Sequence, residues 1–109
     1  MKTRIYQIIP ERDIHRIKFK EIEVMRQHYE DAAPAEIYGC VYDGDLQTDD
    51  LEEIFAILNI EHPDDYKGHS LSVSDIVELE DDNGKCRFFY CDVWGFQEVR
   101  FQKEQAQLI

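Results

Sequence analysis

The stretch IVELEDDNGKCRFFYCDV, residues 76–93, decides the fold. Asn83-Gly84 lies near its middle, and this dipeptide is the strongest short-range hairpin signal because both residues tolerate positive φ. Two strand-forming runs flank it, Ile76–Glu80 and Arg87–Val93. Alternate side chains of a strand point to opposite faces. Both faces of the second run are apolar: Phe88 and Tyr90 on one, Phe89, Cys91 and Val93 on the other. We therefore predict an antiparallel hairpin whose second strand is central and covered on one side by helices.

A helix precedes this hairpin in the sequence. Its apolar stripe repeats at i, i+3, i+4 and i+7, the spacing of one helix face: Leu51, Ile54, Phe55 and Leu58. Asp49 can cap the helix, and Glu52 can return the bond of a capping box. Acids fill the first turn, where the helix dipole favours negative charge. Asn59 can end the helix, and His62-Pro63 keeps it from resuming.

Weaker patterns place the remaining elements. Thr3–Ile9, Ile37–Tyr42 and Glu98–Phe101 read as strands, the second ending at a turn over residues 43–45. Phe19–His28 reads as a short helix. We predict an α+β fold in which a small antiparallel sheet of about four to five strands packs against two short helices. Residues 1–109 form a single domain, with a core over about 4–101 and a tail, 102–109, that frays.

Composition narrows the classes of function. The chain has 109 residues and a net charge of −12. Residues 1–28 carry 7 − 4 = +3 and residues 29–109 carry 5 − 20 = −15. Such an acidic body repels nucleic acid, whose binding depends on Lys and Arg, and favours encounter with a basic protein surface. Three sparse cysteines indicate a reducing compartment, and no apolar run is long enough for a membrane span. We expect a soluble, cytoplasmic protein that needs no cofactor; its oligomeric state is open.

The sequence contains residue types that could form a hydrolase site or a metal site, but their arrangement argues against both. A small hydrolase or nuclease could use His69 or His62, with a serine of the 63–77 segment and Asp75, but Ser70, Ser72 and Ser74 would point away from His69 in an extended segment. The segment more simply closes a tight turn through backbone hydrogen bonds. A metal site lacks the usual Cys and His spacings, and residues 43–50 lack the glycine and the terminal glutamate of a calcium loop. We therefore predict neither an enzyme nor a metal protein.

Several motifs resemble those of the YodL-like domain family. They are Leu51, Phe55 and Asn59 of the helix, His62-Pro63, the run Gly68, Ser70, Ser72, Ser74 and Asp75, and the group Tyr90, Asp92, Gly95 and Phe96. The resemblance covers most of Arg4–Phe101, and Trp94 departs from it. It implies a setting in conjugative elements and phages of Gram-positive bacteria. It implies no catalytic residues, and we expect the motif residues to be structural.

Charge and setting together suggest a function. The leading hypothesis is a non-catalytic inhibitor of a host nucleic-acid-binding defence protein, of the anti-CRISPR or antirestriction type, that presents carboxylates in place of phosphates. The candidate contact residues are Asp43, Asp45, Asp49, Asp50, Glu52, Glu53, Glu61, Asp64, Asp65, Asp81 and Asp82. The alternative for each is a solvated surface acid. The rival function is an accessory or scaffold module of conjugative transfer or plasmid maintenance, contacting its partner through the Gly68–Asp75 loop and Trp94 as an aromatic anchor.

Overall fold

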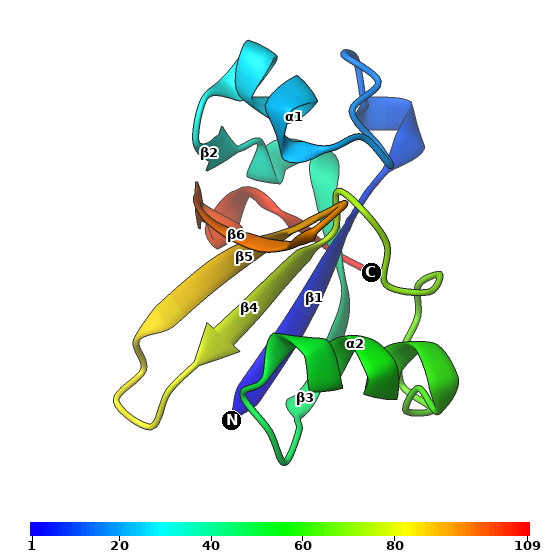
Figure 1. Cartoon of the computed structure of the whole chain (residues 1–109), viewed down its shortest axis with the longest axis vertical. Helices are drawn as coiled ribbons and strands as arrows, with labels where there is room; N and C mark the ends of the chain where they lie inside the picture. The colour runs from blue at the N-terminus through cyan, green and yellow to red at the C-terminus, as the bar shows by residue number, and fades with distance from the viewer.

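The computed structural model describes residues 1–109 and has an α+β fold (Figure 1). Two helices, α1 (Ile22–Tyr29) and α2 (Leu51–Ile60), accompany seven strands. The strands are β1 (Lys2–Ile8), β2 (Ala32–Ala33), β3 (Tyr38–Asp45), β4 (Ile76–Glu80), β5 (Cys86–Asp92), β6 (Gly95–Phe101) and β7 (Gln107–Leu108). Short 3-10 turns lie at Pro10–Arg12, Ala35–Ile37 and Lys103–Gln105. Neither helix has the length and apolar composition needed to cross a membrane.

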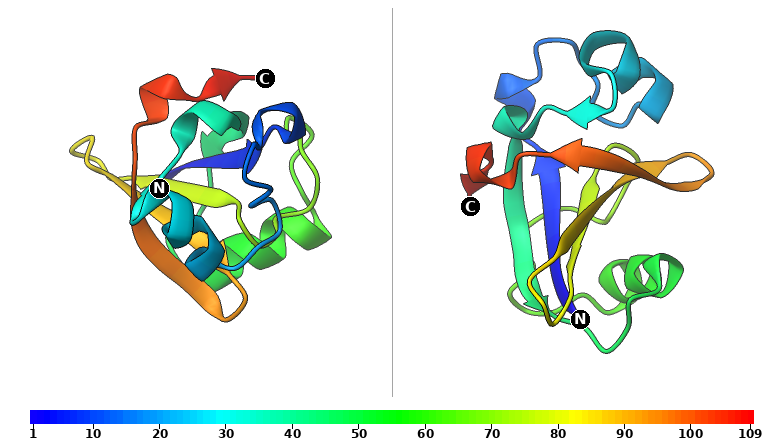
Figure 2. Two further views of the ribbon diagram at one scale, coloured as in Figure 1. Left: turned by 90° about the horizontal axis from the view of Figure 1, so that it is seen from above. Right: turned by 90° about the vertical axis from the view of Figure 1, so that its left-hand side faces the viewer.

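The predicted hairpin forms the middle of the sheet. The strand order is β2-β6-β5-β4-β1-β3-β7, and β4 pairs antiparallel with β5 so that Val77 faces Phe89 across the ladder. Asp81 closes the turn by accepting hydrogen bonds from the backbone N–H groups of Asn83 and Lys85, both at 2.9 Å. Of the Asn-Gly pair only Gly84 has a positive φ, +80°, and the connection between the strands covers residues 81–85. The sheet is strongly curled, and β6 runs across the direction of β1 (Figure 2).

The strand count was predicted too low. Two additional strands, β2 and β7, have two residues each and pair in parallel with β6 and β3, which makes the sheet mixed. The tail that we expected to fray contains β7 and one 3-10 turn. A two-residue strand has no periodicity, because its pairing depends wholly on where the rest of the fold brings its neighbour.

Both faces of the sheet are covered, each by one helix, whereas we expected helices on one side only. On the first face Tyr6, Ile76 and Tyr90 pack with Ile22 and Met25 of α1. On the opposite face Ile5, Val77 and Phe89 pack with Ile54 and Leu58 of α2. Alternation along β1, β4 and β5 therefore supplies two separate cores. The helices lie at different ends of the molecule, α1 at the top of Figure 1 and α2 at the lower right.

The helix boundaries differ from the prediction for identifiable reasons. Asp50, not Asp49, caps α2 by accepting hydrogen bonds from the N–H groups of Glu52 (2.9 Å) and Glu53 (3.4 Å). The helix continues one residue past Asn59, whose side chain instead holds Leu71. Phe19, expected inside the first helix, lies before it with φ +66° and an exposed ring.

Candidate functional site

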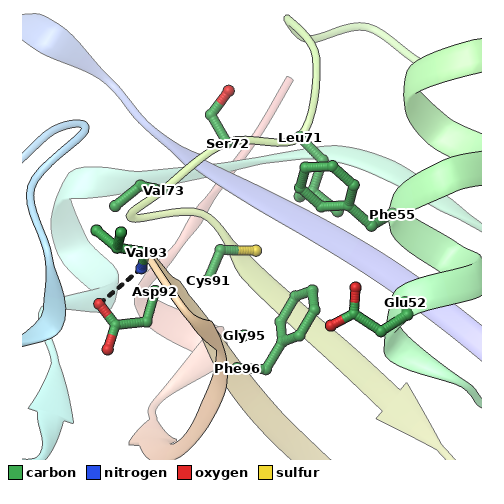
Figure 3. Close-up of a pocket in the computed structure, with 10 residues that line it drawn as sticks. All are labelled: Glu52, Phe55, Leu71, Ser72, Val73, Cys91, Asp92, Val93, Gly95 and Phe96. Atoms are coloured by element: carbon green, nitrogen blue, oxygen red, sulfur yellow. Dashed lines mark hydrogen bonds between the residues drawn. The ribbon is translucent and has the colours of Figure 1, made fainter.

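An apolar groove lies between the first half of α2, residues 71–73 and the turn that joins β5 to β6 (Figure 3). Its volume is about 390 Å³. Three widely separated segments supply its apolar lining: Phe55 from α2, Leu71 and Val73 from the loop, and Cys91, Val93 and Phe96 from the hairpin. Phe55 points toward Leu71, and the carboxylate of Glu52 points toward Phe96 across the opening. The groove lining contains two acids, Glu52 and Asp92, and no Lys or Arg.

Trp94 stands beside this groove. Asp92 pairs with Gly95, so Val93 and Trp94 form the two-residue turn between β5 and β6. Gly95 has φ +92°, a conformation that glycine adopts without the steric cost of a side chain. Trp94 is 91% exposed, and Val93 is 50% exposed. Tryptophan is usually well buried, so this residue exposes far more apolar surface than its type normally does.

The predicted acidic contact residues divide into two groups. Four are engaged locally: Asp50 caps α2, Asp81 closes the hairpin, Asp45 lies 3.9 Å from the N-terminal amino group, and Asp43 pairs with Lys2 (2.9 Å) and Arg4 (3.2 Å). Burial opposes ionisation of Asp43, but its bonds to Lys2 and Arg4 outweigh burial and lower the pKa of its carboxyl. Each of these four acids therefore has a partner within the chain.

The other seven acids are exposed and have no ion pair or side-chain hydrogen bond: Asp49, Glu52, Glu53, Glu61, Asp64, Asp65 and Asp82. Six of them lie between residues 49 and 65. Residues 49–66 contain seven acids, counting Asp50, and no Lys or Arg, so their formal charge is 0 − 7 = −7. Among the predicted contact residues, the unpaired negative charge is therefore concentrated on α2 and the loop that follows it.

The motif run from Gly68 to Asp75 is fixed by Gln7 of β1. Gln7 Oε1 accepts a hydrogen bond from the N–H of His69 (3.1 Å). Its Nε2 donates to the carbonyl of His69 (2.8 Å) and to the carboxylate of Asp75 (3.0 Å). Asp75 also accepts from the N–H of Ser72 at 2.8 Å. Burial raises the pKa of the Asp75 carboxyl to about 7, although both hydrogen bonds oppose the increase.

The remaining motif residues hold the segment before α1. The hydroxyl of Ser74 accepts from the N–H of Phe19 (2.9 Å), and that of Tyr90 donates to the carbonyl of Lys20 (2.8 Å). Asp92 accepts from the N–H of Ile22 (3.1 Å) and so caps α1 from a distant strand. The side chain of Ser70 is exposed, and that of Ser72 bonds only to the carbonyl of Ser70. Five of the family motif residues also line the groove: Phe55, Ser72, Asp92, Gly95 and Phe96.

The structure does not assemble a nucleophile, base and orienting acid. The ring Nδ1 of His69 contacts the carbonyl of Ser70 (2.7 Å) and the amide of Gln7 (3.2 Å), and no serine hydroxyl. Asp75 is buried and bonds to Gln7 and Ser72 rather than to His69. Nδ1 of His62 contacts only the carbonyl of Pro63. Burial raises the pKa of each of the three free thiols, Cys40, Cys86 and Cys91, which disfavours the nucleophilic thiolate.

Sequence reasoning missed a buried charge network. Glu78 of β4 is fully buried and pairs with Arg4 (2.8 Å) and Lys103 (2.9 Å) while Tyr6 donates a hydroxyl hydrogen bond at 2.6 Å. Burial opposes ionisation, but these bonds together lower the pKa of its carboxyl. Glu78, Glu80 and Cys86 have donor atoms within 4.8 Å of one another and would be the ligand set for a metal ion. Arg4 and Lys103 already neutralise the two carboxylates, so the network has a structural explanation.

The sequence around Glu78 could have indicated this buried charge network. An acid at the centre of the apolar run Ile76–Glu80 has to find a cation when the strand lies inside the sheet.

Comparison with known proteins gives one match. The model of the YodL-like domain matches residues 2–101. Neither the curated proteins nor the solved structures show a match to this chain.

Proposed function

We propose, from the premise that this chain belongs to the YodL-like domain family, that it is a non-catalytic acidic protein of a mobile genetic element. In this proposal it binds a host nucleic-acid-binding protein of a defence system and inhibits it, in the manner of an anti-CRISPR or antirestriction protein. The main observation in support of this function is the run of exposed, unpaired acids at the start of α2 and in the following loop.

The electrostatic argument rests on where the free acids lie. Nucleic-acid-binding channels are lined by Lys and Arg, because affinity for phosphates comes largely from counterion release. The N-terminal end of α2 presents Asp49, Glu52 and Glu53, and the following loop presents Glu61, Asp64 and Asp65. Both offer carboxylates to the same cations. The proposal therefore predicts competition with nucleic acid and strong weakening by salt.

Neutralising part of this surface tests the proposal. The triple variant Asp49→Asn, Glu52→Gln, Glu53→Gln removes three free charges and leaves the Asp50 cap intact. Its control is Glu11→Gln, Glu30→Gln, Glu36→Gln, which removes three exposed charges elsewhere on the surface. The measurement is the displacement of labelled DNA from a host protein that co-purifies with the chain, followed by fluorescence anisotropy.

The α2 variant should displace DNA at least about tenfold less effectively than the wild-type chain, and the control should resemble the wild type. Equal loss in both variants would assign the effect to net charge alone. Unchanged displacement by the α2 variant would reject this surface as the inhibitory one.

A second candidate function is favoured by Trp94. An accessory or scaffold module of conjugative transfer or plasmid maintenance would use this 91% exposed ring as its anchor. Under that function Trp94→Ala abolishes partner binding, whereas salt has little effect on it. The salt dependence of binding therefore separates the two candidates.

A further inference from the structure

The apolar groove and the free acids of α2 are parts of one surface. Glu52 belongs to both, because it lines the groove and lies in the first turn of the acidic helix. We infer that the groove receives an apolar side chain from a partner segment whose neighbouring Lys or Arg residues contact the acids of α2. The inference rests on the proposed function, and it adds the chemical class of the bound segment.

The walls of the groove define the central side chain. Phe55, Leu71 and Phe96 face its interior from three different segments (Figure 3). Phe55 is 38% exposed, so a large apolar side chain of its type still has surface to bury. Burying such surface stabilises a complex roughly in proportion to the area removed from water, at about 25 cal/mol per Å². A purely ionic partner would leave the exposed part of Phe55 in water.

The charge around the groove defines the flanking residues. The lining has no cation. Asp49 and the cap Asp50 precede the helix that forms one wall, and Glu52 and Glu53 lie in its first turn. A second copy of the chain seated on this face would bring like charges together, which costs free energy at an interface. Lys or Arg next to the inserted side chain would instead complement the acids. The occupant is therefore a cationic and apolar segment of another protein.

Trp94 supplies the probe for this inference. It is the only tryptophan in the chain, and both of its sequence neighbours line the groove. Its exposed indole emits as a solvated ring, and a segment bound in the groove should shift that emission to shorter wavelength. Three short synthetic peptides serve as ligands: alternating lysine and leucine, alternating lysine and serine, and alternating glutamate and leucine.

The peptides separate charge from apolar contact. We expect the lysine–leucine peptide to bind, the lysine–serine peptide to bind about tenfold more weakly, and the glutamate–leucine peptide not to bind. Phe55→Ala should weaken binding of the lysine–leucine peptide about tenfold and leave binding of the lysine–serine peptide unchanged. The reason is that removing the Phe55 ring from the protein and removing leucine from the peptide abolish the same apolar contact. The matched control is Ile60→Ala, on the same helix, 80% exposed and outside the groove lining.

Three results would overturn the inference. They are equal binding of the lysine–leucine and lysine–serine peptides, equal effects of Phe55→Ala and Ile60→Ala, and binding of the glutamate–leucine peptide. If both lysine peptides bind equally and the α2 triple variant weakens both, the acidic surface stands as proposed and the groove does not. If neither lysine peptide binds, the acidic surface itself fails as a cationic binding site.

Discussion

The side-chain amide of Gln7 donates a hydrogen bond of 3.0 Å to the buried carboxylate of Asp75. This contact joins β1 to the loop before β4, across 68 residues of sequence. The same amide group bonds both backbone polar atoms of His69 through its two ends. The Gln7 side chain therefore bonds to the loop backbone through one donor and one acceptor, as the backbone of a paired strand does. Asp75 is buried beside it, where its charge is poorly solvated.

Asp75 predicts an unusual pH dependence of stability. Its folded pKa of about 7 lies above the ordinary value of about 3.9 for an unfolded aspartate. The folded state therefore binds more protons between these values, and the free energy of unfolding should fall as pH rises from about 4 to about 7. The slope contributed by one group is at most about 1.4 kcal/mol per pH unit.

Asp75→Asn removes this titration. Relative to wild type, the variant should gain stability as pH rises through the window, and the difference should level off above about pH 7. Urea unfolding at a series of pH values measures it. Both proteins are compared in a His69→Asn background, so that the imidazole beside Gln7 does not contribute. A pH-independent difference between the two proteins would contradict the pKa assigned to Asp75.

Gly68 predicts a steric effect in the same region. A Cβ atom at this position would collide with Oε1 of Gln7 and lie 2.9 Å from Cγ2 of Val41. Gly68→Ala should lower the free energy of unfolding by about 1–3 kcal/mol, the usual cost of overpacking. It should also raise amide hydrogen exchange in residues 66–75 more than elsewhere. Ser70→Ala, an exposed change in the same loop, is the control; equal exchange in the two variants would refute the steric explanation.

Local patterns predicted the parts of the fold that local chemistry determines. The β4–β5 hairpin follows from Asn83-Gly84 and from alternation, and α2 follows from its apolar stripe. Phe19 misled the prediction because its spacing to Ile22 and Met25 is helical. Its backbone is held outside the helix by Ser74, which lies 55 residues away. A prediction from local sequence patterns cannot include a contact between residues so far apart in the chain.

The candidate site shows the same division. The concentration of acids between residues 49 and 65 is visible in the sequence. Which acids are free is not, because the partners of Asp43 lie on β1 and the acceptor role of Asp81 depends on the turn geometry. The groove is assembled from three segments on different elements, and Trp94 is exposed only because it occupies the tip of a two-residue turn. Both facts require the tertiary structure.

Glu78 predicts a pH effect of the opposite sign. Its folded pKa is lowered, so its ion pairs stabilise the protein above the ordinary glutamate pKa of about 4.3 and are lost as pH falls through the folded value. Glu78→Gln places an amide donor against Arg4 or Lys103 and leaves a buried charge network incomplete. The free energy of unfolding at neutral pH should fall by about 3 kcal/mol, and this deficit should shrink in acid.

Glu80→Gln is the control for this network. Glu80 pairs with the same Arg4 at 2.7 Å but lies at the solvent edge, so its loss should be much less costly. Urea unfolding at neutral and acidic pH compares the two variants. If Glu78→Gln were no more destabilising than Glu80→Gln, the buried position of Glu78 would have no energetic consequence.

The start of α2 predicts a difference between two adjacent aspartates. Asp50 accepts hydrogen bonds from the backbone N–H groups of Glu52 and Glu53, whereas Asp49 accepts none. Asp50→Ala should therefore lower the free energy of unfolding by about 1 kcal/mol, the typical cost of losing an N-cap, and Asp49→Ala should change it much less. Both substitutions remove one negative charge from the same helix end, so the difference between them isolates the cap. Equal stabilities of the two variants would show that the dipole, rather than the Asp50 hydrogen bonds, accounts for acids at this position.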